Sequence, residues 1–114
     1  MTMTGTGYKF HFPPEFDDRA EYEMTQKGYL GGGEVEFVDG TRYPLFFYEP
    51  VRLSQDSEFA AESGDPVVAE PGMVVVPEVT RKNILTAIDR LIAEQFFDHL
   101  KPITLQVRNG VGIR

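Results

Sequence analysis

The sequence contains no cysteine, and this absence removes several kinds of chemistry at once. A chain without thiols forms no disulfide, has no cysteine nucleophile and binds no metal through thiolate ligands. This composition suits the reducing environment of the cytosol. The first ten residues also lack the basic and apolar regions of a secretory signal. We therefore expect a cytoplasmic protein.

Other chemical signatures are missing as well. The chain has only two histidines, His11 and His99, and they lie far apart without a metal-binding spacing. The glycines at 31–33 lead into a predicted strand and lack the Lys-Ser/Thr pair of a phosphate-binding loop. No serine stands in a G-x-S-x-G motif. We therefore predict no catalytic residue, no metal and no cofactor, which favours a non-enzymatic protein.

Long hydrophobic runs and a positive charge balance are also lacking. No apolar run approaches the roughly 18 residues that a membrane-spanning helix requires, so we expect no membrane association. The net charge is −7, and residues 1–80 carry 15 of the 18 acidic side chains but 5 of the 11 basic ones. A negative surface repels phosphate backbones. Nucleic-acid binding is therefore disfavoured, and a basic protein partner is favoured.

The clearest structural signal lies in residues 80–100. At about 100° per residue, one face of this segment collects Ile84, Leu85, Ile88, Leu91, Ile92 and Phe96. Thr80 can cap the first turn, and Pro102 prevents the helix from continuing. The pattern predicts one long amphipathic helix whose apolar stripe packs on a core.

A hairpin is predicted over residues 34–49. Residues 34–38 alternate between acidic and apolar side chains, and Asp39-Gly40 offers a two-residue turn before the return strand. Pro50 then opens a shorter helix over about 51–62, and strands are predicted at 8–12 and 73–76. Residues 15–28 read as a loop with one helical turn. The order predicts a single α+β domain over 1–114, with a small antiparallel sheet, the long helix packed on it, and loose termini at 1–7 and 108–114.

The return strand at 42–49 is apolar on both faces, whereas a strand covered on one side alternates with polar residues. Pro44 donates no hydrogen bond and so favours an edge strand or a bulge. The second face can be covered by this chain or by another one. Under the second alternative, the interface candidates are Phe46 and Tyr48, joined by Phe97, which lies off the apolar face of the long helix.

These features favour a non-enzymatic association module, either a homodimer or a binder of another protein, for which a basic protein is one option. The alternative is a ligand-binding protein or small enzyme with a pocket between the sheet and the acidic loops. Its polar groups would be His11, Tyr22, Tyr43, Tyr48 and Arg52. For Arg52, an ion pair with Glu49 or Asp56 is the simpler interpretation.

Overall fold

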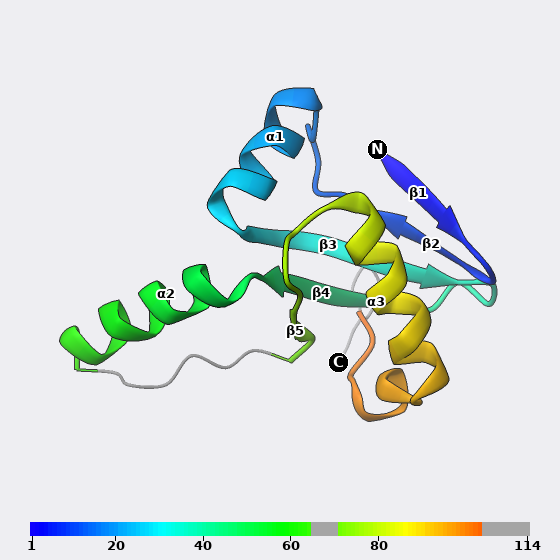
Figure 1. Cartoon of the computed structure of the whole chain (residues 1–114). Helices are drawn as coiled ribbons and strands as arrows, with labels where there is room; N and C mark the ends of the chain where they lie inside the picture. Colours follow the sequence, from blue (N-terminus) through cyan, green and yellow to red (C-terminus); the bar gives the residue numbers. More distant parts are fainter. Residues whose placement is uncertain (65–70, 104–114) are drawn as a thin grey trace, which may run out of the picture.

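Five strands form one mixed sheet in the order β1-β2-β3-β4-β5 (Figure 1). Strands β1 to β4 pair with one another antiparallel, and β5 runs parallel to β4. The computed structural model describes residues 1–64 and 71–103. The elements are β1 (Thr2–Gly5), β2 (Tyr8–His11), α1 (Asp18–Lys27), β3 (Tyr29–Phe37), β4 (Arg42–Tyr48), α2 (Pro50–Glu62), β5 (Met73–Val75), α3 (Arg81–Ala93) and the short 3-10 helix η1 (Phe96–His99). The predicted α+β class is therefore confirmed, and the sheet is mixed because of β5.

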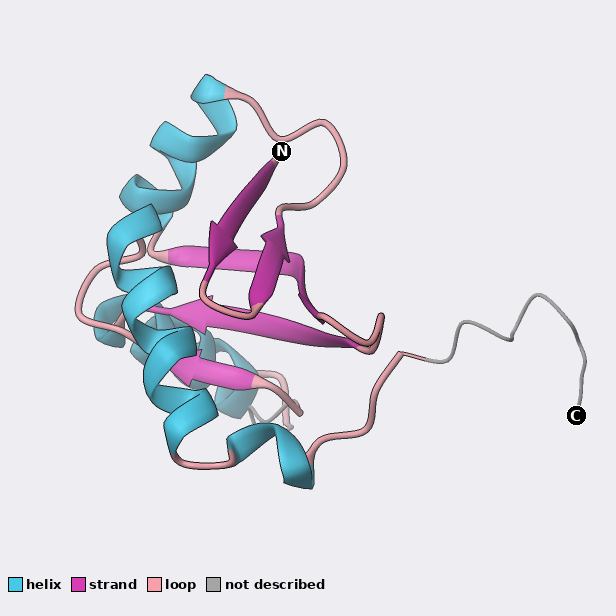
Figure 2. Ribbon diagram, turned by 90° about the vertical axis from the view of Figure 1, so that its right-hand side faces the viewer, coloured by secondary structure: helices cyan, strands magenta, loops and turns pink. Residues whose placement is uncertain are grey.

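The core lies between α3 and one face of the sheet. Figure 2 shows α1 and α3 on the same side of the strands. Ile84 and Ile88 of α3 are fully buried, and Phe10, Leu45 and Phe47 meet them from the sheet. Burying large apolar side chains of this kind contributes about 1.5–3 kcal/mol each. The amphipathic stripe of the long helix was thus predicted correctly.

The predicted C-terminal limit of that helix is wrong. The helix ends at Ala93, and Gln95 takes a left-handed backbone conformation with φ 58° and ψ 31°. This turn redirects the chain into η1 and carries Phe97 back towards the sheet, where it is 6% exposed. The start was predicted correctly, because the Thr80 side chain accepts a hydrogen bond from the Asn83 N–H at 3.1 Å.

The hairpin is confirmed as β3 and β4, but its turn is not the predicted two-residue loop. The Phe37 N–H donates to the Thr41 carbonyl, and the Gly40 N–H donates to the Phe37 carbonyl, both at 2.9 Å. Three residues therefore lie between the paired ends. Gly40 has φ 89°, the positive value that a three-residue turn of this type requires.

Two segments are more ordered than predicted. Residues 15–28 contain α1, whose N-cap is Asp17 and whose Gly28 C-cap is left-handed. Residues 2–5 of the expected loose N-terminus form β1, because Met3 is buried beside Phe10, its neighbour on β2. The expected loose tail at 108–114 lies outside the described residues. The apolar segments at 103–107 and 67–69 also favour extended structure, and of these only residue 103 is described.

The three remaining predicted elements agree with the structure: the strand at 8–12, which is β2, the shorter helix and the strand at 73–76. α2 spans Pro50–Glu62 with proline in its first turn, and β5 covers the first three residues of the predicted 73–76 strand. None of the helices formed by the described residues is both long enough and apolar enough to cross a membrane.

Candidate association surface

The sheet face opposite α3 divides into a polar half and an apolar half. Strand register places Lys9 beside Glu36 and His11 beside Glu34, and Arg42 pairs with Glu36 from β4. These five side chains form the polar half. Within residues 1–64 and 71–103, no helix lies over this face (Figure 2).

The polar half is a chain of short contacts across three strands. His11 Nε2 lies 2.6 Å from Glu36 Oε1, and Arg42 reaches both Glu34 and Glu36 at 3.1 Å. The hydrogen bond from His11, together with the Arg42 charge, holds the pKa of the Glu36 carboxyl below its ordinary value. On the other side of the ring, Thr2 Oγ1 lies 3.0 Å from His11 Nδ1.

This order of hydroxyl, imidazole and carboxylate has the components of a nucleophilic relay. Of these three side chains only Glu36 lines the hollow of about 320 Å³, and Thr2 and His11 line neither that hollow nor the one of about 330 Å³. Glu36 is also paired with Arg42, whose positive charge offsets that of the carboxylate. The contacts therefore join β1, β2, β3 and β4 and fit a structural role better than a catalytic one.

Histidine and carboxylate side chains occur in several elements of residues 1–64 and 71–103. Among those residues, no three histidine, cysteine, aspartate or glutamate side chains are grouped so as to hold a metal ion. Tyr8 is also unsuited to acid–base work, because its hydroxyl donates to Asp89 Oδ1 at 2.9 Å. Burial and the neighbouring Asp89 carboxylate raise the Tyr8 pKa, so the phenol stays neutral.

The apolar half lies towards β5 and the start of α2. The Tyr29 and Tyr48 rings are in contact, with their centroids 4.8 Å apart, and the Arg52 guanidinium lies 5.3 Å from the centroid of the Tyr29 ring. Phe46 is partly exposed, and Val75 at the sheet edge is 49% exposed. An apolar strip therefore continues to the helix that follows β4.

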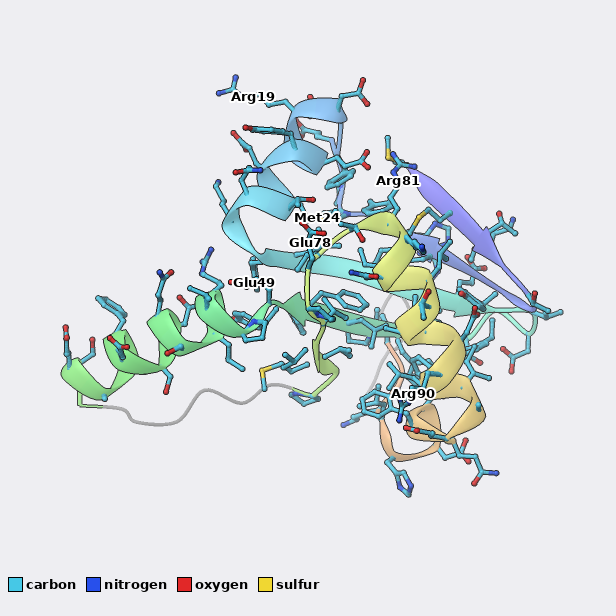
Figure 3. The ribbon with its side chains drawn as sticks, viewed as in Figure 1. Arg19, Met24, Glu49, Glu78, Arg81 and Arg90 are labelled. Carbon is cyan, nitrogen blue, oxygen red and sulfur yellow. The ribbon has the colours of Figure 1, made fainter. Side chains whose placement is uncertain are left out.

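α2 is tethered at its first turn and projects from the sheet beyond it. The Glu49 carboxylate accepts from the Arg52 N–H at 2.7 Å, and the Arg52 side chain bonds Asp56 at 3.1 Å and the Lys27 carbonyl at 3.4 Å. Figure 1 shows the rest of the helix extending away from the other elements. Figure 3 shows its side chains projecting into open space beyond the labelled Glu49.

None of the 13 residues of α2, all of which the structure describes, is buried. Phe59 is 71% exposed and Val51 is 61% exposed. They stand eight residues apart, with Gln55 midway, so all three lie along one ridge of the helix. Isolated helices of about this length are marginal in water, because their stability comes chiefly from packing an apolar face.

The side chains expected at an interface are distributed differently. Phe97 is a core residue, since its ring meets Phe37 at 5.2 Å and Tyr43 at 5.3 Å. Tyr48 is 7% exposed, so it too has little surface to offer a partner. Of the three candidates, only Phe46 keeps a partly exposed ring. The second strand face is in part covered by this chain, through Tyr29.

The structure does not gather the residues expected in a ligand pocket. Tyr22 is 66% exposed on α1, His11 lies in the polar half, and Tyr43 packs towards the core. Tyr48 and Arg52 alone come close to each other, because both contact Tyr29. The ion pair expected between Arg52 and Asp56 is present.

In the sequence, Val51 and Phe59 are apolar members of the helix predicted at about 51–62, and nothing in their residue types marks them as a candidate interface. The signal that distinguishes them is their i, i+8 spacing, which sets them apart from Leu53 and Ala60 around the helix. Comparisons of this chain with protein-family models, with curated proteins and with solved structures found no match.

Proposed function

We propose that this protein is an association module that forms a homodimer through α2. The observation that carries the proposal is the exposed ridge of Val51 and Phe59 on a helix with no buried residue. Large exposed apolar side chains on a projecting element are typical of protein interaction sites.

The charge pattern along α2 favours antiparallel pairing of two copies. Arg52 lies near the N-terminal end, whereas Glu58 and Glu62 lie near the C-terminal end. In a two-fold antiparallel pair centred on Gln55, Val51 of each copy faces Phe59 of the other. The same arrangement brings Glu58 of each copy close to Arg52 of the other, near the positively polarised N-terminus of that helix, which is favourable.

The test is the mass of the protein in solution as a function of concentration, for the native chain and for Phe59→Ser. Burying a phenylalanine contributes about 1.5–3 kcal/mol, and two rings that are 71% exposed contribute about 2–4 kcal/mol per dimer. We expect Phe59→Ser to weaken the dimer by roughly 30- to 700-fold. Sedimentation equilibrium measures this constant.

The matched control is Tyr22→Ser, which removes another aromatic ring of similar exposure from α1. It should leave the dimer constant unchanged. A native chain that stays monomeric at millimolar concentration refutes self-association. Equal weakening by both variants refutes the assignment of the interface to α2.

A basic protein is the second candidate partner, since α2 carries Asp56, Glu58 and Glu62 against Arg52 alone. The two candidates differ in their salt dependence. An apolar dimer persists at high salt, whereas a contact made chiefly by exposed acids weakens steeply as salt screens the charges.

A further inference from the structure

A hollow of about 330 Å³ lies at the other end of the molecule from α2, between the turn of the β3–β4 hairpin, the end of α3 and η1. The left-handed backbone of Gln95 creates it, because this residue turns the chain from α3 into η1. The turn places Phe97 and Asp98 on the same hollow as side chains of the hairpin.

Three aromatic rings form the floor of this hollow, which we call the aromatic hollow. The rings of Phe37, Tyr43 and Phe97 lie 5.2–5.8 Å apart between centroids, with interplanar angles of 52–78°. Phe97 is largely buried among these rings, whereas Phe37 and Tyr43 are partly exposed, so these two rings offer most of the aromatic surface to the hollow. Ring faces carry partial negative charge and attract cations.

Two carboxylates stand at the rim. Asp39 enters from the hairpin turn and Asp98 from η1, and no basic side chain lines the hollow. The Thr41 N–H donates to Asp39 Oδ1 at 2.9 Å, which fixes the carboxylate and lowers the pKa of Asp39. The rim is therefore negative at neutral pH.

We propose that the aromatic hollow binds the side chain of a lysine presented by a basic partner protein. The butyl chain of lysine is apolar and suits contact with Ile92 and the rings, while its ammonium group suits the two carboxylates. The acidic surface of the chain, whose net charge is −7, favours a basic partner over a free anion.

The test adds three probes in turn to the whole chain and measures binding through backbone amide shifts in NMR spectra. The first is acetyl-Gly-Lys-Gly-amide, and the second is the same peptide with norleucine, which keeps the alkyl chain and loses the charge. We expect saturable shifts at Gln95, Phe97 and Asp98 with the lysine peptide, and binding about tenfold weaker with norleucine. Equal binding of the two peptides, or shifts confined to other residues, overturns the proposal.

The third probe, n-butylammonium, separates a protein side chain from a free amine. If n-butylammonium binds more weakly than the lysine peptide, the result supports a lysine presented by a partner protein. If it binds as tightly as the peptide, the proposal is overturned. Asp98→Asn should weaken lysine binding about fivefold without changing the urea midpoint, since Asp98 is exposed. If Asp98→Asn leaves the affinity for the lysine peptide unchanged, the proposal is also overturned.

The matched control is Glu58→Gln, which removes one acidic charge from α2 instead. It should leave lysine binding unaltered, and equal weakening by both charge-removing variants refutes the assignment to this hollow. The proposal is independent of dimer formation, so Phe59→Ser should also bind the lysine peptide normally.

Discussion

Replacing Phe97 tests whether this ring belongs to the core or to an interface. Its side chain is 6% exposed and contacts the rings of Phe37, Tyr43 and Phe96. Truncating a buried phenylalanine to alanine costs about 3–5 kcal/mol, through lost transfer free energy and the cavity left behind. That loss is large beside the roughly 5–15 kcal/mol that stabilises a domain.

The assay is unfolding in urea, monitored by circular dichroism. With a slope of about 1.5 kcal/mol per molar urea, a loss of about 4 kcal/mol lowers the midpoint by about 2.5 M. Phe96→Ala is the matched control, because the adjacent ring is only partly buried, and we expect its cost to be about half as large or less.

A midpoint for Phe97→Ala within about 0.5 M of the native value refutes the core assignment. Loss of self-association by Phe97→Leu, with the midpoint retained, instead assigns the ring to an interface. Phe97→Leu keeps most of the apolar volume, so it reports on folding even if the alanine variant is unfolded.

Two further predictions concern contacts between elements. Glu21 of α1 accepts from Arg81 of α3 at 2.7 and 2.8 Å, and these bonds hold the pKa of the Glu21 carboxyl below its ordinary value. A carboxyl group whose pKa is lower in the folded than in the unfolded protein stabilises the folded state when the pH is above its unfolded-state pKa. This stabilisation is lost as the pH falls through the folded-state pKa. Between pH 7 and pH 3, native urea midpoints should therefore decline more than those of Glu21→Gln; parallel declines contradict this coupling. Gly72→Ala should lower the midpoint even at neutral pH, because Gly72 has φ 88° and an added Cβ would meet the Pro44 carbonyl oxygen. An unchanged midpoint would show that β5 adjusts without cost.

The parts of the fold that the sequence predicts are those with a repeating contrast between apolar and polar positions. Ile84 and Ile88 recur at the helical period, and residues 34–38 alternate as a strand does. α1 was missed because Met24 is its only buried residue, so it has no stripe to detect. Its stability depends on caps and on the pair between Glu21 and Arg81, which is a contact between distant segments.

The end of α3 and the candidate site depend on tertiary contacts that no local pattern encodes. The helical period continues through Phe96, yet burial of Phe97 outweighs the cost of a left-handed Gln95. The contacts of His11 with Thr2 depend on β1, a strand that the sequence did not predict. Conversely, the Arg52–Asp56 pair was predictable because helical neighbours four residues apart face each other.

The brevity of the two outermost strands affects how this molecule behaves when concentrated. β1 has four residues and β5 has three, so each offers few backbone groups to a foreign strand. Long, flat outer strands are templates for fibre growth, and short ones limit it. Crowded conditions should therefore favour reversible contacts between side-chain surfaces over irreversible sheet extension.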